Sequence, residues 1–595
     1  MKTVLGLTLL ACLASTPVAL AQQKQPLQVV FPKDNHQTSA EKIFFLGTAP
    51  PNGQVLINGK PINRSKSGHF APNFPLQIGE NIFTIQHENQ QLQIKVIRTA
   101  GKPEIPQGSV FAPDSLLPST DTARLPGEEI CFSATALPNT NVAVKLSNQL
   151  IPLLQQPSSA DLPSNLSALT GNNTPTTENN VSKYAACTVI ANPGELGKPE
   201  FQFTNKLMNG AKTFTQQGKG GITILSPAQL PVVEVTVDSG LSRTGSNSDF
   251  SRLTPIPKGV RAAVTGKDGE WLRLDYGAWV NSKETRPLPG AVPPRNIIRS
   301  VLSRKQENAT NIVFPMQVPV PVTVQQSNGT LTLTLYNTTA QTDIVRLDDN
   351  PFISRLDWQQ IAPGQVQYTF NLKKQQQWGY NLKYEGTSLI LSLRHPPENL
   401  TAKKGRKSRK PLAGIKILLD PGHGGKESGA SGPNGILEKD VNLTLSKMIR
   451  EELIKRGAEV VMTMEEDKEL SLPDRQAIIA KEQPTIAISV HHNSLPDNGD
   501  AENITGIGMF WYHPQAHSLS VFMHNYLTQK LKRPSYGVFW NNLALARPAA
   551  APSVLLEVGF MSNPTEFEIV TDNREQRKFA VALANCLIEW FKSVK

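Results

Sequence analysis

The 595-residue sequence predicts a multidomain protein in which several small all-β modules precede a C-terminal α/β domain with a mostly parallel sheet. Three observations predict this plan. The chain is too long for a single hydrophobic core. Short strand-like runs fill its first two thirds, and proline (46) and glycine (41) are frequent. From about residue 412, apolar strands alternate with helices, which is typical of a parallel sheet covered on both faces.

Residues 1–21 have the three parts of an export signal. Lys2 provides a positive start, Val4–Leu13 an apolar core, and Ala19-Leu20-Ala21 a small-x-small cleavage site. A lipoprotein signal ending at Cys12 and a buried N-terminal helix are the alternatives. Because no second long apolar run follows, we expect an exported protein of the periplasm or cell envelope with no transmembrane segment.

The first module covers residues 22–100, where strands and turns alternate. Asn58-Gly59 between two apolar runs is a strong hairpin signal. An immunoglobulin-like β-sandwich fits this pattern. Residues 108–230 predict a second β module, interrupted by a disordered insertion at 154–182 that is rich in Ser, Asn, Thr and Pro.

Three cysteines remain once the signal is removed. Cys131 and Cys187 both lie in strand-like segments of the second module, and an exported protein permits a disulfide between them. The sequence does not decide whether this pair forms. Cys586 lies on an apolar helix face and is expected to be a buried thiol. None of them has zinc-finger spacing, so a metal site has to be sought among the 10 histidines.

Residues 231–285 resemble a bacterial Src-homology-3-like barrel. Arg243-Thr244-Gly245 stand where that family has an Arg-Ser-Gly turn, Trp271 opens a strand, and Gly277–Val280 match its usual ending. The alternative is an unrelated small barrel whose tryptophans are only core residues.

Residues 293–397 are again rich in strand-like runs, which include NIVFPMQ, TLTLTLYNT, VQYTFNL and SLILSLRHPP, with Trp358 and Trp378-Gly379-Tyr380 among them. This pattern resembles the AMIN domain, a β-sandwich often placed before wall amidases and thought to target them within the envelope. A basic linker at 398–411 follows. The net charge of +11 and pI of about 9.3 favour anionic wall polymers or lipid head groups as partners, with no nucleic acid.

Polar side chains gather where the strands of the C-terminal segment, 412–595, end. Asp420 ends the first strand and His423 follows it, His491 and Asn493 lie at the end of the strand that begins near 485, and Glu557 ends the strand that begins at 553. In parallel sheets the functional site lies beyond these carboxyl ends. Another carboxylate, Glu438, sits just before a helix, whose dipole favours an anion.

Two imidazoles and one carboxylate form a competent catalytic zinc set. They leave a fourth position for water, whose pKa the metal lowers towards 7. A further carboxylate that is not a ligand can then move protons.

Four sequence blocks resemble the zinc-dependent N-acetylmuramoyl-L-alanine amidases of type 3, in that family's order and spacing. The blocks are DPGHGG, LEKDVNL, AISVHHN and VLLEVGFMSN. The resemblance implies that His423, Glu438 and His491 bind Zn²⁺ and that Glu557 is the catalytic acid and base. It also implies that Arg547, ahead of the last block, shapes the site or holds a substrate carboxylate.

Several neighbouring residues receive supporting roles. Asp420 and Asn493 are expected to orient the ligand imidazoles. His492 is expected to point away from the metal, with a place among the ligands as the alternative. Asp440 is expected to cap a helix and Arg475 to pair structurally. We expect His513, His517 and His524, around a surface-facing helix, to play no part in the chemistry.

The expected function is hydrolysis of the amide between N-acetylmuramic acid and L-alanine in peptidoglycan, during wall remodelling or cell separation. A wall-binding protein that holds zinc without turnover is one alternative. Another zinc hydrolase, such as a peptidase or a sugar deacetylase, is the second, although the HExxH motif is absent. Envelope activators or divisome proteins are candidate partners of what we expect to be a monomer.

In some members of the family that these blocks resemble, a helix inserted between the second histidine and the catalytic glutamate plugs the cleft until an activator binds. The interval from His491 to Glu557 is short here, which predicts an open site unless the β modules or the basic linker cover it. On that basis a truncation to residues 412–595 is expected to be at least as active as the full chain.

Overall fold

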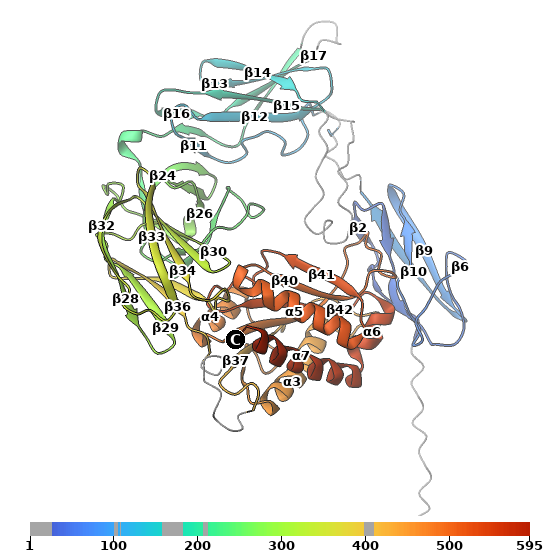
Figure 1. Ribbon diagram of the computed structural model, residues 1–595. Coiled ribbons are helices and arrows are strands. Elements are labelled where there is room, and N and C mark those ends of the chain that lie inside the picture. Colours follow the sequence, from blue (N-terminus) through green and yellow to red (C-terminus); the bar gives the residue numbers. More distant parts are fainter. Residues whose placement is uncertain are drawn as a thin grey trace, which may run out of the picture.

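The computed structural model describes residues 26–99, 105–106, 109–157, 182–205, 212–397 and 410–594 (Figure 1). In the described part of the chain before residue 398, regular structure consists of strands and two short 3-10 turns, and the described α-helices all follow residue 410. The predicted division into β-rich modules and a C-terminal α/β domain is confirmed. The expected signal at 1–21, and most of the 154–182 insertion and the 398–411 linker, lie outside the described residues.

The N-terminal module packs three small sheets around one apolar core that includes Phe45, Phe70 and Ile85. The sheet orders are β1-β4-β7, β2-β10-β9-β5-β6 and β3-β8. The hairpin predicted at Asn58-Gly59 joins β5 and β6, and both turn residues have positive φ (50° and 74°), as a type I′ turn requires. Its strands are β1 (Gln28–Phe31), β2 (His36–Thr38), β3 (Lys42–Phe44), β4 (Leu46–Thr48), β5 (Val55–Ile57), β6 (Lys60–Pro61), β7 (His69–Phe70), β8 (Asn73–Pro75), β9 (Gly79–His87) and β10 (Gln90–Arg98).

The second module holds a six-stranded sheet in the order β12-β15-β14-β13-β17-β18. Cys131 on β12 lies opposite Cys187 on β15, and the two form a disulfide, which answers the question that the sequence left open. The strands of this segment are β11 (Thr122–Arg124), β12 (Glu129–Ala136), β13 (Asn141–Leu146), β14 (Gln149–Gln155), β15 (Ser182–Val189), β16 (Gly194–Gly197), β17 (Glu200–Asn205), β18 (Lys212–Gln217) and β19 (Ile222–Ile224).

The next segment shares a sheet with the second module. β11 pairs with β24 and also with β19, so one sheet runs across the predicted boundary at residues 230–231. Sequence patterns do not show this, because strand pairing between distant segments leaves no local signal. The strands of this segment are β20 (Val232–Val235), β21 (Ser239–Gly240), β22 (Ser242–Arg243), β23 (Ile256–Pro257), β24 (Arg261–Asp268), β25 (Trp271–Leu274), β26 (Trp279–Asn281) and β27 (Thr285–Pro287).

The segment from 293 to 397 forms two sheets, in the orders β32-β28-β29-β36-β35 and β30-β31-β34-β33. Their inner faces bury Phe314, Leu333, Tyr368 and Phe370 completely. The strands are β28 (Asn296–Lys305), β29 (Ala309–Phe314), β30 (Val322–Ser327), β31 (Thr330–Tyr336), β32 (Thr338–Arg346), β33 (Ile353–Ala362), β34 (Gln365–Leu372), β35 (Tyr380–Glu385) and β36 (Ser388–Arg394).

The C-terminal domain has one six-stranded sheet in the order β38-β37-β39-β42-β40-β41. All neighbours are parallel except β40 and β42, which confirms the mostly parallel sheet. Strand β41 was not predicted. The elements are β37 (Lys416–Pro421), α3 (Glu438–Lys455), β38 (Glu459–Met462), α4 (Leu472–Glu482), β39 (Ile486–Asn493), β40 (Ile507–Trp511), α5 (Pro514–Leu531), β41 (Ser535–Trp540), β42 (Ser553–Phe560), α6 (Pro564–Thr571) and α7 (Asn573–Ser593).

Helices cover both faces of this sheet. α3, α5 and α7 pack on one face together with Val554, Leu556 and Val558 of β42. α4 covers part of the other face, where Ile479 meets Leu418 of β37. Because successive residues of a strand point to opposite faces, Glu557 points to the α4 face. No described helix is long and apolar enough to cross a membrane.

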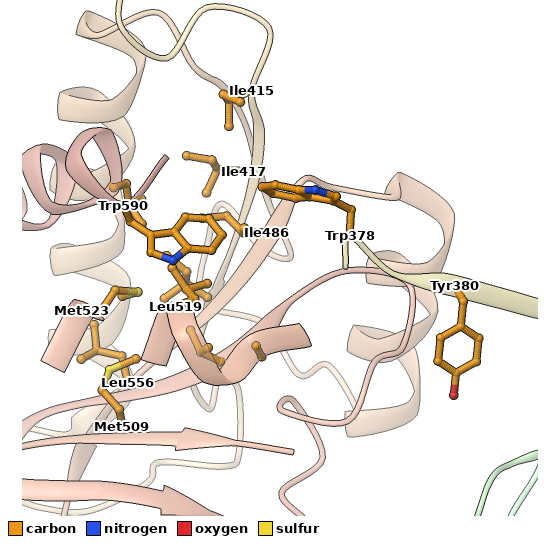
Figure 2. Packing of buried hydrophobic residues seen from close by; sticks show 14 of the residues in the cluster. Trp378, Tyr380, Ile415, Ile417, Ile486, Met509, Leu519, Met523, Leu556 and Trp590 are labelled. Atoms are coloured by element: carbon orange, nitrogen blue, oxygen red, sulfur yellow. The ribbon is translucent and has the colours of Figure 1, made fainter. Parts of the chain in front are cut away.

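One continuous hydrophobic core joins the C-terminal domain to the 293–397 segment (Figure 2). Trp378 lies parallel to Phe591 of α7 (ring centroids 6.2 Å, 7° between planes) and meets Trp590 edge-on at 5.8 Å. Arg394 donates to the carbonyls of Pro484 and Ala550. The two segments therefore form one packed unit rather than independent domains.

The N-terminal module also contacts the C-terminal domain, next to α6 and β42 (Figure 1). Phe44 and Leu46 share a buried cluster with Leu495 and Phe560. His36 Nε2 lies 2.9 Å from the Asp497 carboxylate. This contact touches the loop that follows His491.

Candidate active site

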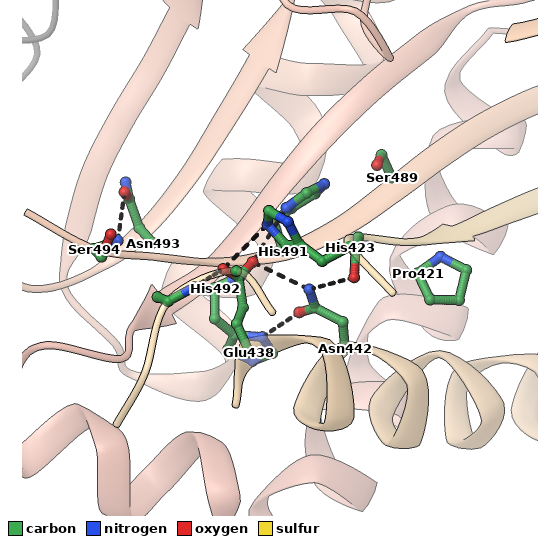
Figure 3. Close-up of polar contacts among 12 residues, drawn as sticks. Pro421, His423, Glu438, Asn442, Ser489, His491, His492, Asn493 and Ser494 are labelled. Atoms are coloured by element: carbon green, nitrogen blue, oxygen red, sulfur yellow. Dashed lines mark hydrogen bonds and ion pairs between the residues drawn. The ribbon is translucent and has the colours of Figure 1, made fainter. Parts of the chain in front are cut away.

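Two histidines and a glutamate from three elements meet at the carboxyl end of the sheet (Figure 3). His423 Nε2 lies 3.2 Å from Glu438 Oε2, and His491 Nδ1 lies 3.2 Å from Glu438 Oε1. One ligand atom from each side chain falls within 4.8 Å of the others. Ligands about 2.0–2.1 Å from a tetrahedral zinc ion are themselves roughly 3.3 Å apart. The three predicted ligands are therefore within coordinating range of a single ion.

The turn after β37 brings His423 to this point. His423 has a φ of 64°, a left-handed backbone conformation that residues other than glycine rarely adopt. Gly422 packs against the imidazole of His491, and a Cβ there would overlap the ring. A Cβ on Gly429, which also has positive φ (65°), would overlap Glu438 and His423. Glycine is needed at both positions because the side chains of the site fill the space next to their backbone.

Glu438 is the first residue of α3 and is buried. Its Oε2 accepts a hydrogen bond from the backbone N–H of Ala430 at 2.8 Å. Burial disfavours its charge, but the contacts with His423 and His491 outweigh burial and hold the pKa of Glu438 well below its usual value. The carboxylate is thus ionised and fixed, as a metal ligand must be.

Asn442, one helical turn after Glu438, is a site residue that the sequence analysis missed. Its Nδ2 donates to Glu438 Oε1 and to the Gly422 carbonyl, both at 3.1 Å. His492 donates from Nδ1 to Asn442 Oδ1 at 2.7 Å, so it points away from the ligands, as strand alternation predicted. Burial lowers the pKa of His492 to about 3, and the ring is neutral. The spacing of four residues between Glu438 and Asn442 could have identified this contact.

Glu557 is paired with His491 in the parallel register of β39 and β42. Its Oε2 is buried and has no hydrogen-bond partner among the described residues. Burial, together with the charge of Glu438, raises the pKa of Glu557 well above its usual value. A cation between the two carboxylates would favour both ionised forms, so their arrangement fits a metal site with a carboxylate beside it.

Asp420 does not contact either imidazole, which corrects the role expected for it. It accepts hydrogen bonds from Thr463 Oγ1 and Ser489 Oγ, both at 2.6 Å, and from Arg475 Nη1 at 2.8 Å. Arg475, expected to pair structurally, forms a buried ion pair with it.

Asn493 and Arg547 are likewise not among the residues that meet at the site. Asn493 accepts from the backbone N–H of Ser494 and lies beside that residue in Figure 3, not beside the imidazoles. Arg547 lies in the loop before β42, where it donates to the Asn542 carbonyl at 2.7 Å. Burial, and then the charge of Arg252, lowers the pKa of Arg547 to about 10. A contact between Arg547 and substrate stays a prediction.

His513, His517 and His524 make their contacts apart from this site. α5, expected to face the surface, packs against α7 and β40. His513 shares a hydrogen bond with the Arg547 carbonyl, His524 bonds Ser535, and His517 packs edge-on against Trp511. At α3, the N-cap is Leu437, without a side-chain cap. Asp440, expected to cap this helix, instead lies in its first turn.

Residues 417–589 match the family described as N-acetylmuramoyl-L-alanine amidase. The chain is 34% identical over 188 residues to a probable cell wall amidase, LytH, of Staphylococcus epidermidis, and 31% identical over 189 residues to its counterpart in Staphylococcus aureus. Each match covers 31% of this chain and 62% of the relative, so the chain spans less than two thirds of these relatives.

Solved structures that match include the amidase AmiC2 of Nostoc punctiforme, at 27% identity and a TM-score of 0.29, over 30% of this chain and 97% of that one. The catalytic domain of the amidase CwlV from Bacillus (Paenibacillus) polymyxa matches at 27% identity and a TM-score of 0.28, over 30% of this chain and 99% of that domain. The family match, residues 417–589, contains His423, Glu438, His491 and Glu557.

Proposed function

We propose that this protein is an exported zinc amidohydrolase that cleaves the amide between the lactyl group of N-acetylmuramic acid and L-alanine in peptidoglycan. One observation carries the proposal: His423, Glu438 and His491 converge within coordinating range with Glu557 beside them. They do so inside the segment that matches the amidase family.

The residues of the site have different roles in the proposed hydrolysis. A zinc ion held by the three ligands would supply a Lewis acid that polarises the scissile carbonyl and acidifies a water. Glu557 accepts the proton of that water as its oxygen attacks the carbonyl carbon. The same carboxyl then protonates the amine of L-alanine as the C–N bond breaks. Its buried Oε2, which has no hydrogen-bond partner among the described residues, is free for both proton transfers.

Two features support an enzyme over a protein that only binds the wall. The ligand set is complete, and the unpartnered Oε2 of Glu557 is positioned for a proton-transfer role that a binding protein does not need. A peptidase or sugar deacetylase would use similar ligands but release different products. Analysis of the products therefore separates these alternatives.

We infer that no inserted helix of the C-terminal domain plugs the site. Between His491 and Glu557 the helix is α5, which packs with α7 on the face of the sheet opposite to Glu557. The N-terminal module instead contacts the loop after His491. The expectation that the 412–595 truncation is fully active needs revision. That truncation would remove the residues of the 293–397 segment that bury Trp590 and Phe591 in the shared core.

We propose an envelope location and wall contacts for the remaining modules. The export-like residues 1–21 and the Cys131–Cys187 disulfide both favour an oxidising compartment outside the cytoplasm. Residues 231–285 and 293–397 are proposed to be the Src-homology-3-like and AMIN-like modules that hold the enzyme on peptidoglycan. The net positive charge suits anionic wall polymers, and envelope activators or divisome proteins are the candidate protein partners.

The proposal is tested by digesting purified peptidoglycan with the zinc-loaded full chain. Mass spectrometry should find stem peptides with free L-alanine amino termini and intact glycan strands. Glu557→Gln should keep zinc and lose roughly 10²–10⁴-fold in turnover, whereas His423→Ala should lose zinc as well. His517→Ala, outside the site, is the matched control. Free acetate, cleaved peptide cross-links, or full turnover by Glu557→Gln would each contradict the proposal.

A further inference from the structure

We infer that Arg475 is a positioning residue that fixes the backbone of His423, so that this loop-borne imidazole is aimed at the metal before the metal arrives. This inference rests on the proposed function, since it concerns the same metal site. It gives a defined task to an arginine that sequence patterns indicate only as a structural partner.

The need for such a residue comes from where the ligands sit. Glu438 is held by α3 and His491 by β39, both regular elements with their own hydrogen bonds. His423 lies in the turn beyond β37 and has a positive φ (64°). Residues other than glycine keep this conformation only where surrounding contacts hold it. Of the three ligands, His423 therefore depends most on outside support.

The guanidinium of Arg475, from α4, donates hydrogen bonds to the backbone of that turn. Nη1 donates to the Pro421 carbonyl and Nη2 to the His423 carbonyl, both at 2.6 Å. These two bonds span both sides of Gly422, the residue that packs on the His491 ring. The planar fork of an arginine can reach two carbonyls at a fixed separation, which the single ammonium of a lysine cannot do.

Arg475 is itself fixed from its other side. Its Nη1 also pairs with Asp420 at 2.8 Å, and its Nε donates to the Leu470 carbonyl at 3.0 Å. The two charged side chains are 3% and 1% exposed, so the pair is dry and leaves little room for another geometry. Thr463 and Ser489 donate two further hydrogen bonds to the Asp420 carboxylate.

A matched control exists in the same domain. Arg533 forms a buried ion pair with Glu566 at 2.5 Å, with side chains 9% and 4% exposed. Glu566 accepts from the backbone N–H groups of Gly506 and Phe560 and does not contact the ligands. Replacing either arginine by lysine therefore disturbs a buried pair, but only Arg475→Lys removes a bond to the backbone of a metal ligand.

The experiment measures zinc affinity by chelator competition, and the visible absorption of the Co²⁺-loaded full chain, for the unaltered protein, Arg475→Lys and Arg533→Lys. We expect Arg475→Lys to bind zinc about 10–100-fold more weakly and to shift the cobalt bands, because the support of a ligand is lost. Arg533→Lys should keep the affinity and the spectrum, even if thermal unfolding shows equal destabilisation of both variants. Unchanged zinc affinity and cobalt bands in Arg475→Lys would overturn the inference, as would an equal loss of affinity in both variants.

A second variant covers the case in which Arg475→Lys does not fold. Thr463→Val keeps the shape of the side chain and removes one hydrogen-bond donor to Asp420. It therefore holds the Arg475–Asp420 pair less firmly and changes no metal ligand. It should weaken zinc binding several-fold, and unchanged affinity would contradict the inference. None of these readouts needs substrate. If the unaltered chain binds zinc but does not release L-alanine termini, the proposed function fails while the inference stands.

Discussion

The shared core between the 293–397 segment and the C-terminal domain leads to the prediction that Trp378→Ala separates the two. The indole lies against Trp590 and Phe591 of α7, and only 3% of Trp378 is exposed (Figure 2). Alanine would leave a cavity at the centre of the interface, since the aromatic partners are held by a different segment and cannot move in to fill the space of the indole.

The magnitude follows from this burial. A tryptophan buries about 150–250 Å² of surface, which at about 25 cal/mol per Å² corresponds to roughly 4–6 kcal/mol as an upper bound. Measured replacements of a buried Trp by Ala cost about 3–5 kcal/mol. A loss of about 4 kcal/mol weakens the association of the two parts by roughly 10³-fold.

The assay cuts the chain between the two parts without removing either. A specific protease site replaces part of residues 398–409 in the full chain, and the cleaved protein is passed over a size-exclusion column. The fragments of the otherwise unaltered chain should elute together. Those of Trp378→Ala keep the contact between the N-terminal module and the C-terminal domain, and should come apart at protein concentrations roughly 10³-fold higher than the unaltered fragments do. Trp358→Ala, in the same segment but 42% exposed, is the control and should behave like the unaltered chain. Separation of the unaltered fragments would refute the view of a single packed unit.

Three further predictions concern single contacts. Gly422→Ala should abolish zinc binding while the protein stays folded, because its Cβ would overlap the His491 ring, and full zinc occupancy in this variant would contradict the geometry of the turn. Burial lowers the pKa of His513 to about 4, whereas in the unfolded chain it is about 6.5. Protonation of the unfolded chain therefore lowers the free energy of unfolding by up to about 3 kcal/mol as the pH drops from 6.5 towards 4, and this loss is absent above about pH 6.5. His513→Gln should make the fall in melting temperature over that range shallower, and an identical slope would exclude His513 as its cause. Cys131→Ser should lower the free energy of unfolding by about 4 kcal/mol relative to the oxidised protein, since the bond to Cys187 closes a loop with a sequence separation of 56. Under reducing conditions the variant and the unaltered protein should be equally stable. A difference between those two reduced samples would assign the loss to the serine itself.

The sequence predicted those parts of the structure that local patterns determine. Alternation of strands and helices after residue 412 identified the mostly parallel sheet, and the rule that sites lie at carboxyl ends of strands located His423, His491 and Glu557 together. The Asn58-Gly59 turn was found because its backbone conformation admits few residues.

What the sequence did not predict depends on contacts between distant segments. The sheet that joins β11 to β24 and the core around Trp378 leave no periodic signal in either partner. The role of Asp420 was misplaced for the same reason. An aspartate before a histidine indicates proximity to the ligand, but only the fold shows that an arginine stands between them.

The central claim is that His423, Glu438 and His491 hold one zinc ion, and X-ray absorption at the zinc K-edge of the loaded full chain tests it most directly. We expect about one zinc per chain, with two imidazole nitrogens at about 2.0–2.1 Å, oxygen ligands at about 2.0–2.2 Å and no sulfur. A sulfur shell near 2.3 Å, or a fit that requires more than two imidazoles, would contradict it.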